Sequence, residues 1–370
     1  MSVELKRAPL PAGAYRPVHE MDLGELEAIR LILRGSSVVD WRRLHFQTAA
    51  EVEHFLRLNL LDLADQRDEK RLRAVLGQAV EYLRNAFGYR VAESVSDPAD
   101  LRDLFLLASG AAEPKKCRRI ACVVLKCMHV VHHLEARELL FRTPVREADL
   151  ADRVDRRVMA EARRMVQLGF PIVEFKGNLK SRRSLMTKLL AKRETVAAQV
   201  FDRVRYRIVT ERPDQIVPVL LHLTQTLFPF NYAVPEQSQN SLVKFRSIVG
   251  GHPRASEIIP RLQAPLGLEA AEKKHLNEFS ARGYRVLNFV VDLPIRIDDL
   301  VPSSGTWLSE DLGRVAFSLV EFQIVDAATA RANEEGESSH ERYKNRQIKR
   351  VLRRLSRGLV VPKKRKHAKG

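Results

Sequence analysis

The stretch RVAFSLVEFQIVD, residues 314–326, sets the fold class of the C-terminal half of this 370-residue chain. Glu321 and Gln323 fall on one face of the predicted strand and the apolar residues around them fall on the other, because successive side chains of a strand point to opposite sides. A carboxylate on a largely buried strand needs a partner, which a metal ion or a general-base role would supply. The stretch therefore predicts a sheet with one chemically active face.

Three further runs rich in β-branched and aromatic residues predict strands, and segments with helical spacing lie between them. The runs are FPIVEF (170–175), FDRVRYRIVT (201–210) and GYRVLNFVVDL (283–293). We predict an α+β domain over residues 170–350, with a mixed β-sheet flanked by helices. The segment 231–282 is expected to be an irregular excursion with one or two helices, since Gly and Pro interrupt it.

The preceding part of the chain has apolar residues at three- and four-residue spacing, which predicts an all-α domain over residues 21–169. Residues 1–20 are expected to form a flexible N-terminus, and residues 351–370 a basic C-terminal tail. Capping residues are predicted at Asp22, Thr48 and Asp97. Helix ends are predicted at Gly35, Gly88 and Gly110.

Composition favours a soluble globular protein, since 45% of the residues are hydrophobic and 29% are charged. We see no apolar window long enough to cross a bilayer and no signal peptide, so we expect a cytoplasmic protein without membrane contact. The three cysteines lie too close together for a disulfide framework. A net charge of +17 favours polyanionic partners such as nucleotides, RNA or DNA, although an Arg-rich genome would produce the same bias.

The segment GNLKSRRSLMTKLLAK, residues 177–192, predicts an anion site. Gly177 is expected in a turn, and four residues that would share one helix face follow it: Lys180, Ser184, Lys188 and Lys192. Ammonium groups beside a helix N-terminus favour phosphate binding. A solvated charged face is the alternative interpretation.

Three further polar residues complete this candidate site. Strand alternation directs Tyr284 and Asn288 together toward a cleft. Asp202 is the natural second carboxylate for a Mg²⁺ site. Alternation, however, puts Asp202 opposite Arg205 and Arg207, so either a bulge re-aims it or it is a cap or a salt-bridge partner.

Three histidines of the helical region, His129, His132 and His133, lie near Glu135 and two cysteines. They could form a metal site, but their spacing fits neither a zinc finger nor an HExxH helix. We therefore expect them to pack or to form hydrogen bonds inside the helical bundle.

Taken in order, these motifs resemble the synthetase domain of the RelA/SpoT family between residues 174 and 344. The matching positions are Gly177, Lys180, Ser184 and Lys188; Asp202 with Arg207 and Ile208; Asn231 to Pro235; Gly283, Tyr284, Val286 and Asn288; Glu321 and Gln323; and His340, Tyr343 and Lys344.

The resemblance implies transfer of pyrophosphate from ATP to a ribose 3′-hydroxyl of GDP or GTP. It implies Mg²⁺ as cofactor on Asp202 and Glu321, with Glu321 also activating the attacking hydroxyl. The implied residues for the ATP donor are Gly177, Lys180, Ser184, Lys188 and Arg207. The implied residues for the acceptor are Tyr284, Asn288, Gln323, His340 and Lys344.

Several positions depart from the family pattern: Asn178, Val286, Asn288, Val325 and Asp326, besides the insertion before Gly283. They lie near the implied substrates and leave the acceptor open. One alternative is a toxin-like enzyme that pyrophosphorylates the 3′ end of tRNA, with RNA contacts through the basic tail. Another is a non-catalytic nucleotide- or RNA-binding regulator. No HD dipeptide occurs, so the family's hydrolase domain is not expected.

Overall fold

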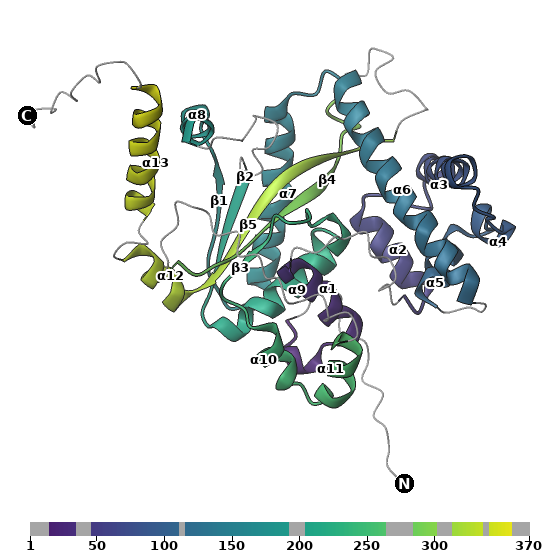
Figure 1. Cartoon of the computed structure of the whole chain (residues 1–370), viewed down its shortest axis with the longest axis horizontal. Coiled ribbons are helices and arrows are strands. Elements are labelled where there is room, and N and C mark those ends of the chain that lie inside the picture. Colours follow the sequence, from purple (N-terminus) through teal and green to yellow (C-terminus); the bar gives the residue numbers. More distant parts are fainter. Residues whose placement is uncertain are drawn as a thin grey trace, which may run out of the picture.

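The computed structural model describes residues 15–34, 46–110, 115–191, 204–263, 284–301, 313–335 and 340–356 (Figure 1). Its centre is a five-stranded sheet with the strand order β1-β2-β5-β4-β3. The strands are β1 (Ile172–Leu179), β2 (Val204–Thr210), β3 (Gln239–Asn240), β4 (Leu287–Arg296) and β5 (Val315–Asp326). β2 and β5 are parallel and the other neighbours are antiparallel, so the mixed sheet predicted from the sequence is confirmed. β3 was not predicted, because two residues carry no periodic signal.

Helices surround the sheet and fill the N-terminal region. Those before the sheet are α1 (Leu23–Arg34), α2 (Ala49–Leu58), α3 (Gln66–Phe87), α4 (Glu93–Ser96), α5 (Leu101–Ser109), α6 (Lys115–Arg142) and α7 (Glu147–Gln167). Those within and after it are α8 (Arg182–Ala191), α9 (Ile216–Thr226), α10 (Phe245–Gly250), α11 (Ala255–Gln263), α12 (Ala327–Glu334) and α13 (His340–Leu355). Single 3-10 turns are η1 (Val18–Glu20), η4 (Pro213–Gln215) and η5 (Phe230–Tyr232). In the described part of the chain, no helix is long and apolar enough to span a membrane.

Most predicted helix boundaries are confirmed, with one correction. Thr48 caps α2, and the Asp22 carboxylate accepts a hydrogen bond from the backbone N–H at the start of α1. Asp97 was a wrong prediction, because α5 is capped by Asp100 and Asp97 ends the short α4. Pro98 follows Asp97 and favours an extended conformation there, so the second aspartate of the DPAD sequence takes the cap.

The glycine stops behave as expected where the structure describes them. Gly88 and Gly110 follow α3 and α5 with φ of 65° and 88°, a region that glycine enters without a steric cost. The predicted stop at Gly35 lies outside the described residues.

One face of the sheet forms the main hydrophobic core. Tyr206, Phe289 and Phe322 on this face are fully buried, and α1, α7 and α9 cover them (Figure 1). Ile29 of α1 and Val158 of α7 belong to the same core. Two helices of the predicted N-terminal domain thus pack on the sheet. The division of the chain into two domains at residue 169 stays a prediction.

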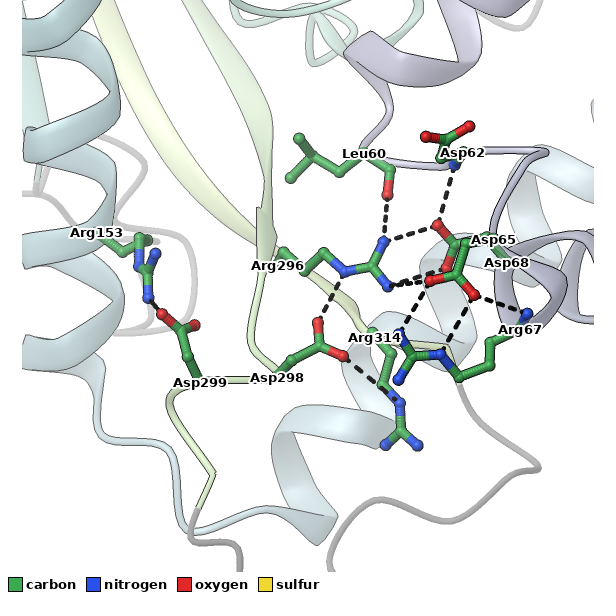
Figure 2. A network of polar contacts seen from close by, with 10 residues as sticks. All are labelled: Leu60, Asp62, Asp65, Arg67, Asp68, Arg153, Arg296, Asp298, Asp299 and Arg314. Atoms are coloured by element: carbon green, nitrogen blue, oxygen red, sulfur yellow. Dashed lines mark hydrogen bonds and ion pairs between the residues drawn. The ribbon is translucent and has the colours of Figure 1, made fainter.

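A second core joins α2, α3, α5 and α6, and Arg296 at the end of β4 attaches this bundle to the sheet (Figure 2). The Arg296 guanidinium donates to both oxygens of the buried Asp68 carboxylate, at 2.7 and 3.1 Å, and to the Leu60 carbonyl at 3.1 Å. Its Nε donates to Asp298 at 2.8 Å. One side chain therefore holds together α3, the preceding loop and the sheet.

Candidate functional site

The face of the sheet opposite the main core carries a row of polar residues across all five strands. Register pairing places the row in the order Lys176, Arg207, Gln323, Asn288 and Gln239, from β1 to β3. Residues paired between neighbouring strands share a face, so these side chains are neighbours although they lie far apart in sequence. We call this side of the sheet the polar face. It also includes the neighbouring row of Asn178, Arg205 and Glu321.

The adjacent row has a single carboxylate at its centre. Asn178 pairs with Arg205, and Arg205 pairs with Glu321, on the three neighbouring strands β1, β2 and β5. The side chain of Glu321 is only 8% exposed. Asn288 donates to Glu321 Oε1 at 2.8 Å and Gln323 donates to the same oxygen at 3.4 Å. Two neighbouring amides thus fix the orientation of the carboxylate.

The other carboxylate oxygen, Glu321 Oε2, is buried and has no hydrogen-bond partner among the described residues. The Nε atom of Arg205 lies 3.9 Å from it, within ion-pair distance but beyond hydrogen-bond distance. Asn288 Oδ1 is also buried, and no residue in the described part of the chain donates a hydrogen bond to it. Unbonded buried oxygens are costly, which makes this spot a candidate for ligand or cation binding.

Tyr284 belongs to the polar face, as predicted. It packs against a small apolar cluster that includes Val209 and Val325. Burial raises the pKa of its phenol, and the positive charges of Arg205 and Arg207 partly oppose that shift. The ring therefore lies close to both guanidinium groups, at the edge of the site.

The departure from the family pattern at Asp326 has a local structural reason. Its carboxylate accepts a hydrogen bond from the backbone N–H of Thr329 at 3.0 Å and caps α12. Glu334 at the other end of α12 forms an ion pair with Arg207 at 3.0 Å. Helix α12 is thereby held against the polar face at both ends.

Gly177 lies in β1 and not in the predicted turn. A Cβ atom there would come within 2.8 Å of the Tyr206 ring and 3.1 Å of an Asp155 carboxylate oxygen. It therefore faces the core side, where the absence of a side chain lets Tyr206 donate a hydrogen bond to Asp155 at 3.0 Å. Its role at the ATP donor stays a prediction.

The row predicted on one helix face, Lys180, Ser184 and Lys188, begins two residues before the helix does. Helix α8 starts at Arg182, because the Ser181 hydroxyl accepts a hydrogen bond from the Ser184 N–H at 3.3 Å. Lys180 therefore precedes the helix and is half-buried, while Ser184 is exposed in its first turn. Lys188 lies on α8, and Lys192 lies outside the described residues.

Helix α13 contains the two acceptor residues predicted near the C-terminus. It begins at His340, and Lys344 is exposed in its second turn. The helix packs beside α8, and Arg354 donates to the Leu190 carbonyl at 2.5 Å (Figure 1). No described contact joins either residue to Glu321. Asp202 and Gly283 lie outside the described residues.

The histidines of α6 pack between this helix and the sheet, and not inside the helical bundle as predicted. His133 Nδ1 lies 3.2 Å from Asp292 on β4, and His132 Nδ1 shares a hydrogen bond with the Tyr232 hydroxyl at 3.4 Å. Burial lowers the pKa of His129 and of His132 to about 3. In the described ranges, no group of three or more His, Cys, Asp or Glu side chains could hold a metal ion.

Sequence reasoning missed three residues of the polar face: Lys176, Arg205 and Gln239. Strand alternation placed Arg205 on the correct side, but only the register of β2 against β5 brings it next to Glu321. Gln239 gave no signal, because β3 has two residues. The fold and the polar face together define an α+β protein with a cationic face around a buried carboxylate, which suits a phosphorylated ligand.

Comparison with known proteins returns solved structures only, since no family profile and no curated protein matches the sequence. Small alarmone synthetase 1 from Bacillus subtilis is similar at 17% identity, covering 54% of this chain and 86% of that one, with a TM-score of 0.26. Small alarmone synthetase 2 from the same organism is similar at 18% identity, covering 60% of this chain and 95% of that one, with a TM-score of 0.27. A GTP pyrophosphokinase family protein from Streptococcus pneumoniae is similar at 14% identity, covering 55% of this chain and 85% of that one, with a TM-score of 0.25.

Likeness at these TM-scores establishes no activity, so a functional assignment has to rest on the polar face itself.

Proposed function

We propose that this protein is a nucleotide pyrophosphotransferase of the RelA/SpoT type, which moves pyrophosphate from ATP to a ribose 3′-hydroxyl. The observation that carries the proposal is Glu321. It is a buried carboxylate with one oxygen that has no hydrogen-bond partner among the described residues, and cations and amides are its register neighbours. The ordered motifs of the sequence support the same assignment.

Glu321 is suited to accept the proton of the attacking hydroxyl. Asn288 and Gln323 donate to its Oε1 atom, which leaves the two lone pairs of Oε2, one for the proton of the 3′-hydroxyl and the other for a cation. As the proton moves to Oε2, the hydroxyl oxygen bonds to the β-phosphorus of ATP and the bond to the α-phosphate oxygen breaks, releasing AMP. A general base positioned in this way contributes about 10²- to 10⁴-fold to a rate.

The cations of the polar face are suited to the donor triphosphate. The proposed donor contacts are Arg207 on this face, with Lys180, Ser184 and Lys188 before and on α8. The proposed acceptor contacts are Tyr284, Asn288, Gln323, His340 and Lys344. Catalysis of phosphoryl-type transfer is mostly positioning and charge neutralisation, which such a face can provide.

The described residues also fit a magnesium ion. Glu321 Oε2 and Asn288 Oδ1 are hard oxygen atoms that are buried without hydrogen-bond partners, and Mg²⁺ prefers such ligands together with water and phosphate oxygens. Asp202 remains the proposed second carboxylate. Bound there, Mg²⁺ would neutralise charge on the phosphate oxygens.

The polar face does not identify the acceptor, and α13 supplies an observation in favour of tRNA. Lys344, Lys349 and Arg353 are exposed on this helix, which precedes the lysine-rich tail. GDP or GTP is the first candidate, and the tRNA 3′ end is the second.

The test is transfer of label from γ-labelled ATP, in the presence of Mg²⁺, to GDP, to GTP or to deacylated tRNA. We expect one acceptor to be labelled and Glu321→Gln to reduce the rate at least about 10²-fold. Glu174→Gln is the matched control, because Glu174 is an exposed glutamate on β1. No label with any acceptor, or a Glu321→Gln variant as fast as wild type, would refute the proposal and favour a non-catalytic nucleotide-binding protein.

Tail deletion separates the two acceptors. If the substrate is tRNA, removing residues 358–370 should weaken RNA binding, and wild-type binding should fall steeply with salt, because phosphate contacts release counterions. Salt-independent RNA binding would remove any role for the tail.

A further inference from the structure

Arg205 balances the negative charge of Glu321. It stands where a metal cation bound to this carboxylate would otherwise do so. The two residues are register partners on parallel strands, and their side chains form an ion pair at 3.9 Å. A buried carboxylate requires compensation. In the described part of the chain, Arg205 is the cation that comes within 4 Å of Glu321.

The ion pair is loose. Nε of Arg205 is too far from Oε2 for a hydrogen bond, and Oε2 has no other donor. Among the described residues no hydrogen bond holds the Arg205 guanidinium, and its side chain is 23% exposed against 8% for Glu321. The guanidinium can therefore move outward without breaking a hydrogen bond, while Glu321 is held by two amides.

Arg207, two residues further along the same face, differs in this respect. Its guanidinium forms an ion pair with Glu334 of α12 at 3.0 Å, with a hydrogen bond. A charge already paired at hydrogen-bond distance is less free to change partners. The two arginines thus share a strand, a face and a charge, but only Arg205 faces the central carboxylate.

We propose that Arg205 is the resting counter-ion of Glu321, and that it exchanges this carboxylate for a phosphate oxygen of the nucleotide when a divalent cation binds at Oε2. Two positive charges cannot share one buried carboxylate without strong repulsion, so the guanidinium must leave for the cation to enter. An arginine suits the second position, because its planar fork matches phosphate oxygens. The inference rests on the metal site of the proposed function.

The proposal predicts opposite effects of one substitution on two ligands. Without nucleotide, Arg205→Gln should bind Mn²⁺ about tenfold more tightly than wild type, since the competing charge is gone. With Mg²⁺ present, the same variant should bind a non-hydrolysable ATP analogue about tenfold more weakly, since a phosphate contact is gone. A purely structural ion pair would produce neither the gain nor this reversal.

The experiment titrates Mn²⁺ into the full-length protein and follows the free-ion signal by electron paramagnetic resonance, with circular dichroism to verify folding. Arg207→Gln removes the same charge from the same face and should change the Mn²⁺ dissociation constant less than about threefold. Arg205→Lys retains the charge and should remain near wild type, which keeps the test available if Arg205→Gln does not fold. Glu321→Gln should abolish the tight Mn²⁺ site.

Equal effects of Arg205→Gln and Arg207→Gln would reduce the result to general electrostatics and overturn the inference. So would tighter Mn²⁺ binding by Arg205→Lys, weaker binding by Arg205→Gln, or no Mn²⁺ binding by any variant. An active enzyme whose Mn²⁺ affinity ignores Arg205 would overturn this inference alone. Tighter Mn²⁺ binding by Arg205→Gln in a protein that transfers no pyrophosphate would instead overturn the proposed function.

Discussion

Replacing Arg296 by Met should weaken the attachment of the helical bundle to the sheet, because this guanidinium joins α3 to β4 (Figure 2). Its two hydrogen bonds to Asp68 are charge-assisted, and a third reaches the Leu60 carbonyl. Methionine has a similar apolar stem but leaves the Asp68 carboxylate, which is 4% exposed, without its counter-ion. The carboxylate keeps one hydrogen bond, from the Asp62 N–H at 3.0 Å.

Breaking a buried ion pair by removing one partner costs about 3 to 5 kcal/mol. The Arg296 side chain is 30% exposed and Asp68 retains one donor, so we expect the lower end, about 3 kcal/mol. Urea unfolding followed by far-ultraviolet circular dichroism measures the loss, and separate transitions for bundle and sheet would show that their coupling has been broken.

The control for this prediction lies in the same network. Arg67 forms an ion pair with Asp65 at 3.0 Å but is exposed, and exposed pairs contribute little. Arg67→Met should therefore leave the unfolding curve unchanged within error. If Arg296→Met and Arg67→Met behave alike, the argument that burial makes Arg296 the attachment point is wrong.

Two further predictions concern stability. Burial lowers the pKa values of His129 and His132 to about 3, so below the unfolded histidine pKa of about 6.5 the unfolded chain binds more protons than the folded one. Stability should therefore fall as the pH drops through about 6.5, by about 2 kcal/mol per histidine at pH 5. Urea midpoints across this range that do not move would contradict the assignment. Gly177→Ala should destabilise the fold by about 1 to 3 kcal/mol, because the new Cβ would lie 2.8 Å from the Tyr206 ring. Gly77→Ala, in the exposed middle of α3 where a Cβ would have nothing within 4 Å, should stabilise the fold by about 0.5 to 1 kcal/mol. Thermal melts in which both variants shift in the same direction would refute the steric argument.

The four longer strands and their faces could be predicted from the sequence alone. Alternation depends only on local backbone geometry, so Glu321 and Gln323 were placed opposite the core before any tertiary information. Tyr284 and Asn288 were assigned to the active side for the same reason. Contacts within one strand or one helix turn carry a local signal, which a single sequence retains.

The errors have equally local causes. Asp97 and Asp100 are both acceptable caps, and only the path of the chain after α4 decides between them. Gly177 resembles a turn residue, but the glycine is required by the approach of Tyr206 from the neighbouring strand. In both cases the deciding contact is not encoded by the spacing.

The sequence by itself determined that the C-terminal half has a mixed sheet, and that Glu321 and Gln323 share the polar side of one strand. Only the tertiary structure decided which residues meet. The parallel register of β2 against β5 places Arg205 beside Glu321, and the antiparallel register of β4 brings Asn288 to the same carboxylate. The physical reason is that alternation is a property of each strand alone, whereas register is set jointly by packing of the core face and by the loops between strands.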